Sequence, residues 1–255
     1  MAEQTSFDKN SAGPKTAMLL AAGLGTRLRP LTDNLPKPLV PVAGKTLLQR
    51  GLELLAAAGV AKTIINIHYK ADILAAFVKK IAPHYAMELV LSDETDYLLD
   101  SAGGIIKALP LLGQEPFFVL NADTFWLEEP GSAPNLHRLA HAFNPVKQDM
   151  LLLTLPCGQA PGIAKADFLQ NAAGNLSRAG KAPLSPQAVL YAGGLITRPA
   201  IFANAAANMP QSLNRYFDRA VAQKRLYGLK LQAEWHSVGS MAELYQTEAA
   251  LQKCD

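Results

Sequence analysis

The residues that could do chemistry gather in a glycine-containing stretch near the start of the chain. It reads Leu19-Leu-Ala-Ala-Gly-Leu-Gly-Thr-Arg27 and continues a short apolar run. Gly23 and Gly25 carry no Cβ atom, so backbone N–H groups there can come close to phosphate oxygens. Arg27 has a permanent charge and a planar set of donors that suits phosphate. These residue types predict a loop that binds the polyphosphate of a nucleotide.

A second cation follows in an unusual setting. Lys37 stands between Pro36 and Pro38. Because each proline fixes its φ angle and disfavours a helix, we expect Lys37 on a stiff, extended segment, as a fixed point charge beside the phosphates.

Two common phosphate motifs do not describe this loop. The dinucleotide fingerprint needs a third glycine where the chain has Leu28, and the P-loop needs a Gly-Lys-Ser/Thr that is missing. A strand followed by Gly-x-Gly also occurs in ordinary turns. The residues around it must therefore distinguish a phosphate-binding loop from such a turn.

That pattern, taken with Pro36-Lys-Pro-Leu-Val-Pro-Val42, resembles the sugar-1-phosphate nucleotidyltransferases, also called NDP-sugar pyrophosphorylases. The resemblance covers most of the chain, from about residue 15 to residue 251, and is densest over 19–60 and 101–123. It implies an α/β fold: a three-layer α/β/α sandwich around a mostly parallel, Rossmann-like (GT-A-like) sheet, without a β-helix extension. It also implies the reaction of an NTP with a sugar-1-phosphate to give an NDP-sugar and pyrophosphate, with Mg²⁺ as cofactor.

Within that family the chain is most similar to the N-acetylmuramate-1-phosphate uridylyltransferases, with mannose-1-phosphate guanylyltransferase-like proteins close behind. The expected substrates are therefore UTP or GTP and a sugar-1-phosphate. The residues alone reveal neither the base nor the sugar.

Apolar periodicity predicts alternating strands and helices in the first half of the chain. Strands are expected over 16–22, 63–68, 87–91 and 117–120, and helices over 47–59, 72–81 (with Asp72 as N-cap) and 102–112. The second half predicts strands over 150–155, 189–197 and within 226–235, helices over 212–224 and 241–252, and a loop with a hairpin over 158–186. We expect a mobile tail over 1–15 and one domain over 16–255. Its nucleotide-binding half would span 16–125 and its sugar-binding half 126–255.

Asp123 ends the apolar strand Phe117-Phe-Val-Leu-Asn-Ala-Asp123. Such a residue could simply cap a turn, but ligands bind beyond the carboxyl ends of parallel strands, where the glycine loop also lies. A carboxylate there suits Mg²⁺, which prefers oxygen ligands and keeps several waters. The resemblance implies the same role, since the family's first metal ligand ends this strand.

The resemblance assigns the other site residues. Arg27, Lys37 and Asp123 would be catalytic. Nucleotide binding would involve Leu20, Ala21, Ala22, Gly23, Gly25, Thr26, Arg27, Asn66, Ala102, Gly103 and Gly104. The sugar would contact Asn121, Asp167 and Gly193. We interpret His68 as a packed or capping residue rather than a catalyst.

One departure from the family pattern concerns the metal. Relatives have Trp-x-Asp-Val-Gly-Thr, whose Asp is the second metal ligand, whereas this chain has Trp235-His-Ser-Val-Gly-Ser240. Ser237 therefore stands where the carboxylate is missing, and His236 would point to the opposite face of the strand. A slower enzyme, or a non-catalytic protein that binds a nucleotide or nucleotide sugar, is the alternative. A glycosyltransferase is a further alternative, although it would usually have Asp-x-Asp where this chain has Asn121-Ala-Asp123.

Composition limits the class of protein. The 255 residues are 49% apolar and 18% charged, with a net charge of +3, which argues against a nucleic-acid partner. Cys157 and Cys254 match no zinc or redox spacing. No apolar run is long enough to cross a bilayer, and the N-terminus lacks the apolar middle of a signal peptide. We expect a cytoplasmic protein without a membrane partner, as a monomer or small homo-oligomer.

Overall fold

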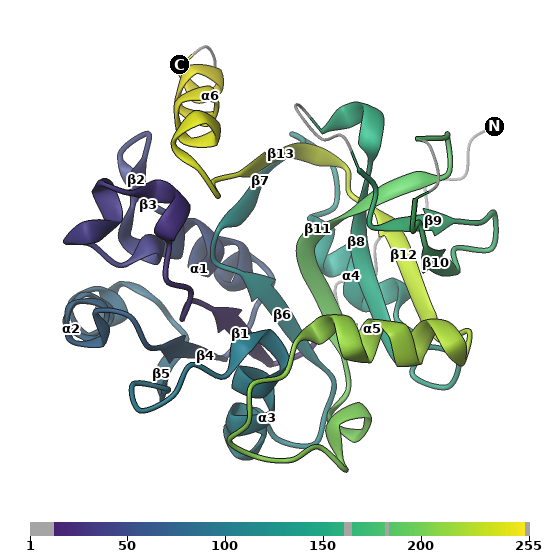
Figure 1. Ribbon diagram of the computed structural model, residues 1–255, viewed down its shortest axis with the longest axis horizontal. Helices are drawn as coiled ribbons and strands as arrows, with labels where there is room; N and C mark the ends of the chain where they lie inside the picture. Colours follow the sequence, from purple (N-terminus) through teal and green to yellow (C-terminus); the bar gives the residue numbers. More distant parts are fainter. Residues whose placement is uncertain (1–12, 161–164, 182–183, 253–255) are drawn as a thin grey trace.

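The computed structural model describes residues 13–160, 165–181 and 184–252 (Figure 1). Most of the expected N-terminal tail, and Cys254, lie outside the described residues. No helix in the described part of the chain combines the length and the apolar character needed to cross a membrane.

Four parallel strands form the first half of the main sheet. They are β1 (Thr16–Leu20), β4 (Lys62–Ile67), β5 (Glu88–Asp93) and β6 (Phe117–Asn121), in the spatial order β6-β1-β4-β5. Every pairing among them is parallel, so their carboxyl ends meet at one edge of the sheet. The helices between them are α1 (Leu47–Ala57), α2 (Ala71–Ile81) and α3 (Asp100–Leu112).

The second half of the sheet is mixed. Its strands are β8 (Met150–Pro156), β9 (Phe168–Gln170), β10 (Leu176–Arg178), β11 (Ala188–Thr197) and β12 (Leu226–Lys230). β11 runs antiparallel to β6, β8 and β9, whereas β12 is parallel to β8. The predicted Rossmann-like class is thus confirmed, with the parallel pattern carried mainly by the first half.

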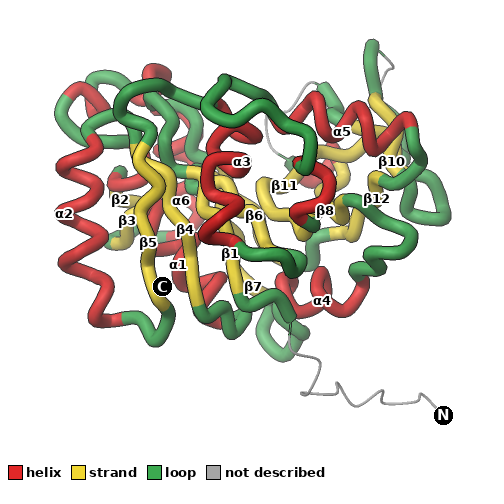
Figure 2. Tube along the Cα trace, turned by 90° about the horizontal axis from the view of Figure 1, so that it is seen from below, coloured by secondary structure: helices red, strands yellow, loops and turns green. Residues whose placement is uncertain are grey.

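Helices cover both faces of the sheet, as the alternation of side chains along a strand requires. Ala17 and Leu19 of β1 pack with α1, α2 and α4 (Asn135–Ala142), whereas Met18 packs with α3 and α5 (Leu213–Ala222). Figure 2 shows α3 and α5 on one side of the strands and α1 and α4 on the other.

Two small strand pairs and a helix frame the sheet. β2 (Pro41–Val42) pairs with β3 (Lys45–Thr46), and β7 (Thr124–Glu128) pairs antiparallel with β13 (Ala233–Ser237). The C-terminal helix α6 (Met241–Leu251) follows β13 directly (Figure 1). A separate apolar cluster lies beneath these elements and includes Leu28, Phe125, Val238 and Leu244.

Local signals explain the start of α1 but not that of α2. α1 begins with a capping box, in which Gln49 N donates to Thr46 Oγ1 at 3.2 Å and Thr46 N donates to Gln49 Oε1 at 3.1 Å. The prediction that Asp72 is the N-cap of α2 is wrong, however. Its N-cap is Lys70 in the left-handed region (φ 50°), and Asp72 lies inside the helix.

The segment around Lys37 also differs from the prediction. Instead of an extended strand, Lys37–Leu39 forms a 3₁₀ turn in which Leu39 N donates to Pro36 O at 2.9 Å. Proline is compatible with the first turn of a helix because its missing N–H would have no partner there. Pro38 therefore stiffens this turn rather than preventing it.

Gly193 shows how closely β11 and β7 approach. Its φ is +87°, and a Cβ atom there would lie 1.9 Å from Thr124 Oγ1. This oxygen is buried and, among the described residues, has no hydrogen-bond partner. Only glycine satisfies both the backbone angle and the space at this position.

We therefore expect Gly193→Ala to lower the free energy of unfolding by about 2–4 kcal/mol through strain and overpacking. Urea unfolding measures the change. Gly158→Ala is the matched control, since a Cβ atom there would meet nothing within 4 Å and its φ is not positive. Equal stability of the two variants would contradict the prediction.

Candidate active site

A cavity of about 460 Å³ opens where β1, β4 and β6 end. This is the edge at which ligands bind in sheets of this kind. Predicted residues that line it are Leu20, Ala21, Ala22, Gly23, Gly25, Thr26, Arg27, Lys37, Asn66, Asn121 and Asp123. The glycine loop and Asp123 thus lie at the same cavity, as expected.

Gly25 shapes the loop. It has φ +65°, and a Cβ atom there would lie 2.9 Å from the Cβ of Lys37 and 3.0 Å from Cγ2 of Thr32. The hydroxyl of Thr32 donates to the Gly25 carbonyl at 2.8 Å. A glycine is thus required for the loop to fold back against the turn that carries Lys37.

Lys37 and Asp123 form an ion pair across the cavity. The Nζ of Lys37 lies 2.6 Å from Oδ2 of Asp123, and their side chains are 11% and 37% exposed. Because the lysine is nearly buried, this carboxylate supplies the partner that a buried charge needs. The more exposed carboxylate remains open toward the cavity.

Asn66 organises the loop from behind. Its Oδ1 accepts a hydrogen bond from Ala21 N at 2.7 Å, and its Nδ2 donates to Glu94 Oε1 at 2.8 Å. The other oxygen of Glu94 accepts from Leu99 N at 3.1 Å. Asn66 and Glu94 are 3% and 2% exposed, so this buried network fixes where β1 ends and the loop begins.

Three of the predicted nucleotide-binding residues, Ala102, Gly103 and Gly104 of α3, lie behind the cavity rather than at its wall. Ala102 N and Gly103 N both donate to Gln211 O, at 2.8 and 3.0 Å. A Cβ atom at Gly104 would lie 2.5 Å from Glu94 Oε1. In the structure, these residues allow close packing around the network and do not line the cavity.

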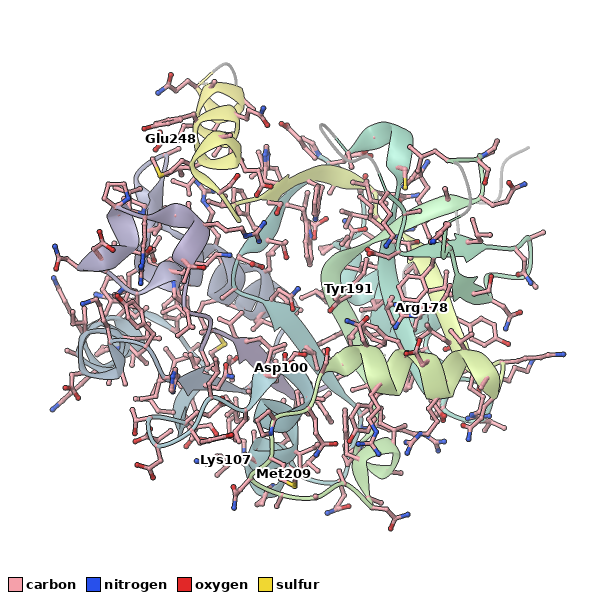
Figure 3. The ribbon with its side chains drawn as sticks, viewed as in Figure 1. Asp100, Lys107, Arg178, Tyr191, Met209 and Glu248 are labelled. Carbon is pink, nitrogen blue, oxygen red and sulfur yellow. The ribbon has the colours of Figure 1, made fainter. Side chains whose placement is uncertain are left out.

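Asp100 and Ser101 line the cavity in their place. Asp100 begins α3 with φ +59°, an unusual angle for a residue other than glycine. Figure 3 shows it at the start of α3, near the centre of the molecule.

The predicted sugar-binding residues do not come together in this cavity. Asn121 lines it, whereas Asp167 and Gly193 do not. Oδ2 of Asp167 instead accepts a hydrogen bond from Tyr191 N at 3.0 Å. Burial, and to a smaller extent Asp123, raises the pKa of the Tyr191 hydroxyl, which has no hydrogen-bond partner among the described residues.

Ser237 lies beside Asp123 along the backbone but is not among the residues that line the Asp123 cavity. It pairs with Thr124 in the β7–β13 register, and Val238 N donates to Asp123 O at 2.9 Å. Ser237 lines a neighbouring cavity of about 500 Å³. His236 is 6% exposed and stacks on Phe125 with ring centroids 5.0 Å apart, so it points into the core as expected.

Sequence reasoning missed several residues of the wall: Leu24, Pro38, Glu94, Leu98, Asp100, Ser101, Ala122 and Gly239. Glu94 immediately follows β5, which ends at the same edge as β4 and β6. A polar residue at the end of a neighbouring parallel strand was the signal that could have identified it.

The residues of this cavity suit Mg²⁺ only where substrate phosphates and waters supply most of its ligands. Among the described residues there is no group of three or more His, Cys, Asp or Glu side chains that could hold a metal. Mg²⁺ often binds through one or two carboxylates together with substrate phosphates and waters. The partly exposed carboxylate of Asp123 fits that arrangement.

This parallel-sheet edge, with its glycine loop and paired charges, defines a nucleotide-binding α/β protein. The family model described as "Nucleotidyl transferase" matches residues 16–161. The chain belongs to this family and is a nucleotidyltransferase that acts on sugar-1-phosphates.

Known proteins show how close the similarity is. The chain is 37% identical over 243 residues to the N-acetylmuramate alpha-1-phosphate uridylyltransferase of Caulobacter vibrioides, covering 94% of this chain and 98% of that protein. It is 41% identical over 109 residues to the mannose-1-phosphate guanyltransferase of Aspergillus fumigatus, covering 42% and 30%. A solved UDP-glucose pyrophosphorylase complexed with UDP-glucose has the same fold, with a TM-score of 0.75 at 18% identity over 94% of this chain and 99% of that one.

The buried network predicts a pH effect on stability. Burial raises the pKa of the Glu94 carboxyl above its ordinary value of 4.5, although hydrogen bonds from Asn66 and Leu99 oppose this. As pH rises, the unfolded chain loses this proton before the folded protein does, so the folded state loses stability. Glu94→Gln cannot titrate at this position.

We expect the stability of the wild-type protein, relative to Glu94→Gln, to be greatest below pH 4.5 and to fall as pH rises through the raised pKa. Urea unfolding of both proteins across a pH series measures this difference. A relative stability that rises with pH would show that hydrogen bonding outweighs burial at Glu94.

Proposed function

We propose that the protein transfers a uridylyl group from UTP to N-acetylmuramate-1-phosphate, giving the UDP-sugar and pyrophosphate. One observation carries the proposal: the cavity brings the glycine loop, Arg27 and the Lys37–Asp123 pair to the edge where β1 and β6 end. The similarity to the N-acetylmuramate alpha-1-phosphate uridylyltransferase of Caulobacter vibrioides supports the choice of base and sugar. The cytoplasm, as the place of the reaction, is part of the proposal.

The chain's own residues would act by position and charge. An oxygen of the sugar phosphate would attack the α-phosphorus in line, so the protein needs no nucleophile. Arg27 would stabilise the charge that develops on the departing pyrophosphate, and Lys37 would neutralise the phosphates at the reacting centre. The backbone of residues 21–26 would hold the remaining phosphate oxygens.

Asp123 would hold Mg²⁺ beside the phosphates, and the ion would reduce charge repulsion at the α-phosphate. Because Asp123 pairs with Lys37 in this structure, the carboxylate would exchange that partner when the nucleotide arrives.

A second candidate is guanylyl transfer to mannose-1-phosphate, which the Aspergillus relative supports for part of the chain. The test for both is a pyrophosphate-release screen of the four NTPs against a panel of sugar-1-phosphates with Mg²⁺. Release with UTP and N-acetylmuramate-1-phosphate supports the proposal, and release with GTP and mannose-1-phosphate supports the second candidate. Nucleotide binding without release in every combination would favour a non-catalytic protein.

Removal of either cation should slow the reaction strongly. We expect Arg27→Ala and Lys37→Met each to lower kcat/KM by on the order of 10²–10³-fold, the effect of losing one preorganised stabilising group. Arg29→Ala is the matched control, because its ion pair with Asp33 is largely exposed and should contribute little. Near-normal activity of Arg27→Ala would refute its role.

The missing second carboxylate yields another prediction. Ser237→Asp would add negative charge next to Asp123 along the backbone, so it should tighten divalent-ion binding and raise the rate at low Mg²⁺. Mn²⁺ titration followed by electron paramagnetic resonance, together with activity against Mg²⁺ concentration, measures both effects. If an active enzyme gains neither, position 237 does not correspond to the family's second ligand.

A further inference from the structure

The guanidinium of Arg27 lies against the start of the C-terminal helix. A Cβ atom at Gly239 would lie only 2.9 Å from Nη2 of Arg27. The same atom would lie 3.0 Å from Oε2 of Glu243. The cation and the carboxylate therefore face each other across the space that the missing Gly239 side chain leaves.

Glu243 is held in place by the helix that carries it. Ser240 is the N-cap of α6, and its hydroxyl accepts a hydrogen bond from Glu243 N at 3.3 Å. In an ordinary capping box the glutamate would reach back to the N-cap backbone. Here Oε2 of Glu243 reaches one residue further and accepts from Gly239 N at 2.5 Å.

Apolar residues next to Arg27, Gly239 and Glu243 in the sequence hold this arrangement in place. Leu28, Val238 and Leu244 adjoin Arg27, Gly239 and Glu243 in the sequence, respectively. All three neighbours are buried in one cluster. The backbones that carry the three residues are thus packed together, although Arg27 itself is exposed.

Arg27 forms no hydrogen bond or ion pair with the residues that the structure describes. A long, exposed side chain of this kind loses rotamer freedom when it binds a ligand, which reduces affinity. A carboxylate that already draws the guanidinium over the cavity would lower that cost.

We propose that Glu243 and Gly239 are positioning residues, which hold Arg27 over the nucleotide cavity before the NTP binds. This inference rests on the proposed function, because it assigns Arg27 to the phosphates. Gly239 leaves room for the guanidinium, and Glu243 both anchors the Gly239 backbone and attracts the charge. The C-terminal helix thereby becomes part of the nucleotide site although only Gly239 of this region lines the cavity.

Three variants separate these contributions. Glu243→Gln keeps an acceptor for Gly239 N but removes the charge. Glu243→Ala removes both, and Gly239→Ala places a methyl group where Arg27 lies. Glu248→Gln is the matched control, since Glu248 lies on the same helix five residues beyond Glu243 (Figure 3).

The first arm uses nucleotide-free protein. The Arg27 Nε–Hε signal, identified by its loss in Arg27→Lys, should report an ordered side chain by heteronuclear NOE in the wild type and in Glu248→Gln. We expect that order to fall in Glu243→Gln and Gly239→Ala, with the melting temperature of Glu243→Gln unchanged. An equally ordered Arg27 in these two variants would overturn the inference.

The second arm measures UTP and GTP binding by calorimetry. Glu243→Gln should weaken affinity by on the order of threefold to tenfold, the cost of ordering one long side chain. In an Arg27→Ala background the same change should have no effect, and an equal loss there would overturn the positioning role. If the wild type binds neither nucleotide, the proposed function fails, whereas the first arm still decides whether Glu243 positions Arg27.

Discussion

The contact between Lys37 and Asp123 is the constraint on which the site depends. It joins a turn near the start of the chain to the end of β6, with Nζ and Oδ2 2.6 Å apart. Since Lys37 is nearly buried, moving Asp123 away would leave the lysine charge without a partner in a poorly hydrated place. The missing Cβ of Gly25 gives Lys37 the room it needs, so the glycine loop serves this ion pair as well as the phosphate binding proposed for it.

Much of the cavity could be predicted from the sequence because its residues follow strands of a parallel sheet. The apolar runs before Gly23 and before Asp123 identify two strands, and parallel strands bring their carboxyl ends together. Local chemistry then assigns the loop and the cations. These inferences need only short stretches of sequence and one rule of topology. For this reason the predicted residues agree well with those that line the cavity.

The parts that could not be predicted depend on contacts between distant segments. Gly103 packs against Gln211, and no local pattern announces that α3 starts earlier, at Asp100. The cavity is lined by the first two residues of this helix, Asp100 and Ser101, whereas the residues that follow them pack against the interior. A contact between distant segments also explains the position of Asp167, whose Oδ2 accepts a hydrogen bond from Tyr191 N of β11.

The charges of the site are balanced before any substrate arrives. Lys37 faces Asp123, and Arg27 lies opposite Glu243 across Gly239. A triphosphate would compete with Asp123 for Lys37, so part of its attraction would be used to replace that partner, whereas Arg27 forms no ion pair with Glu243 that would have to be broken. The ion pair keeps Lys37 oriented in the free protein, and under the proposed function the same competition would limit how tightly the departing pyrophosphate is held.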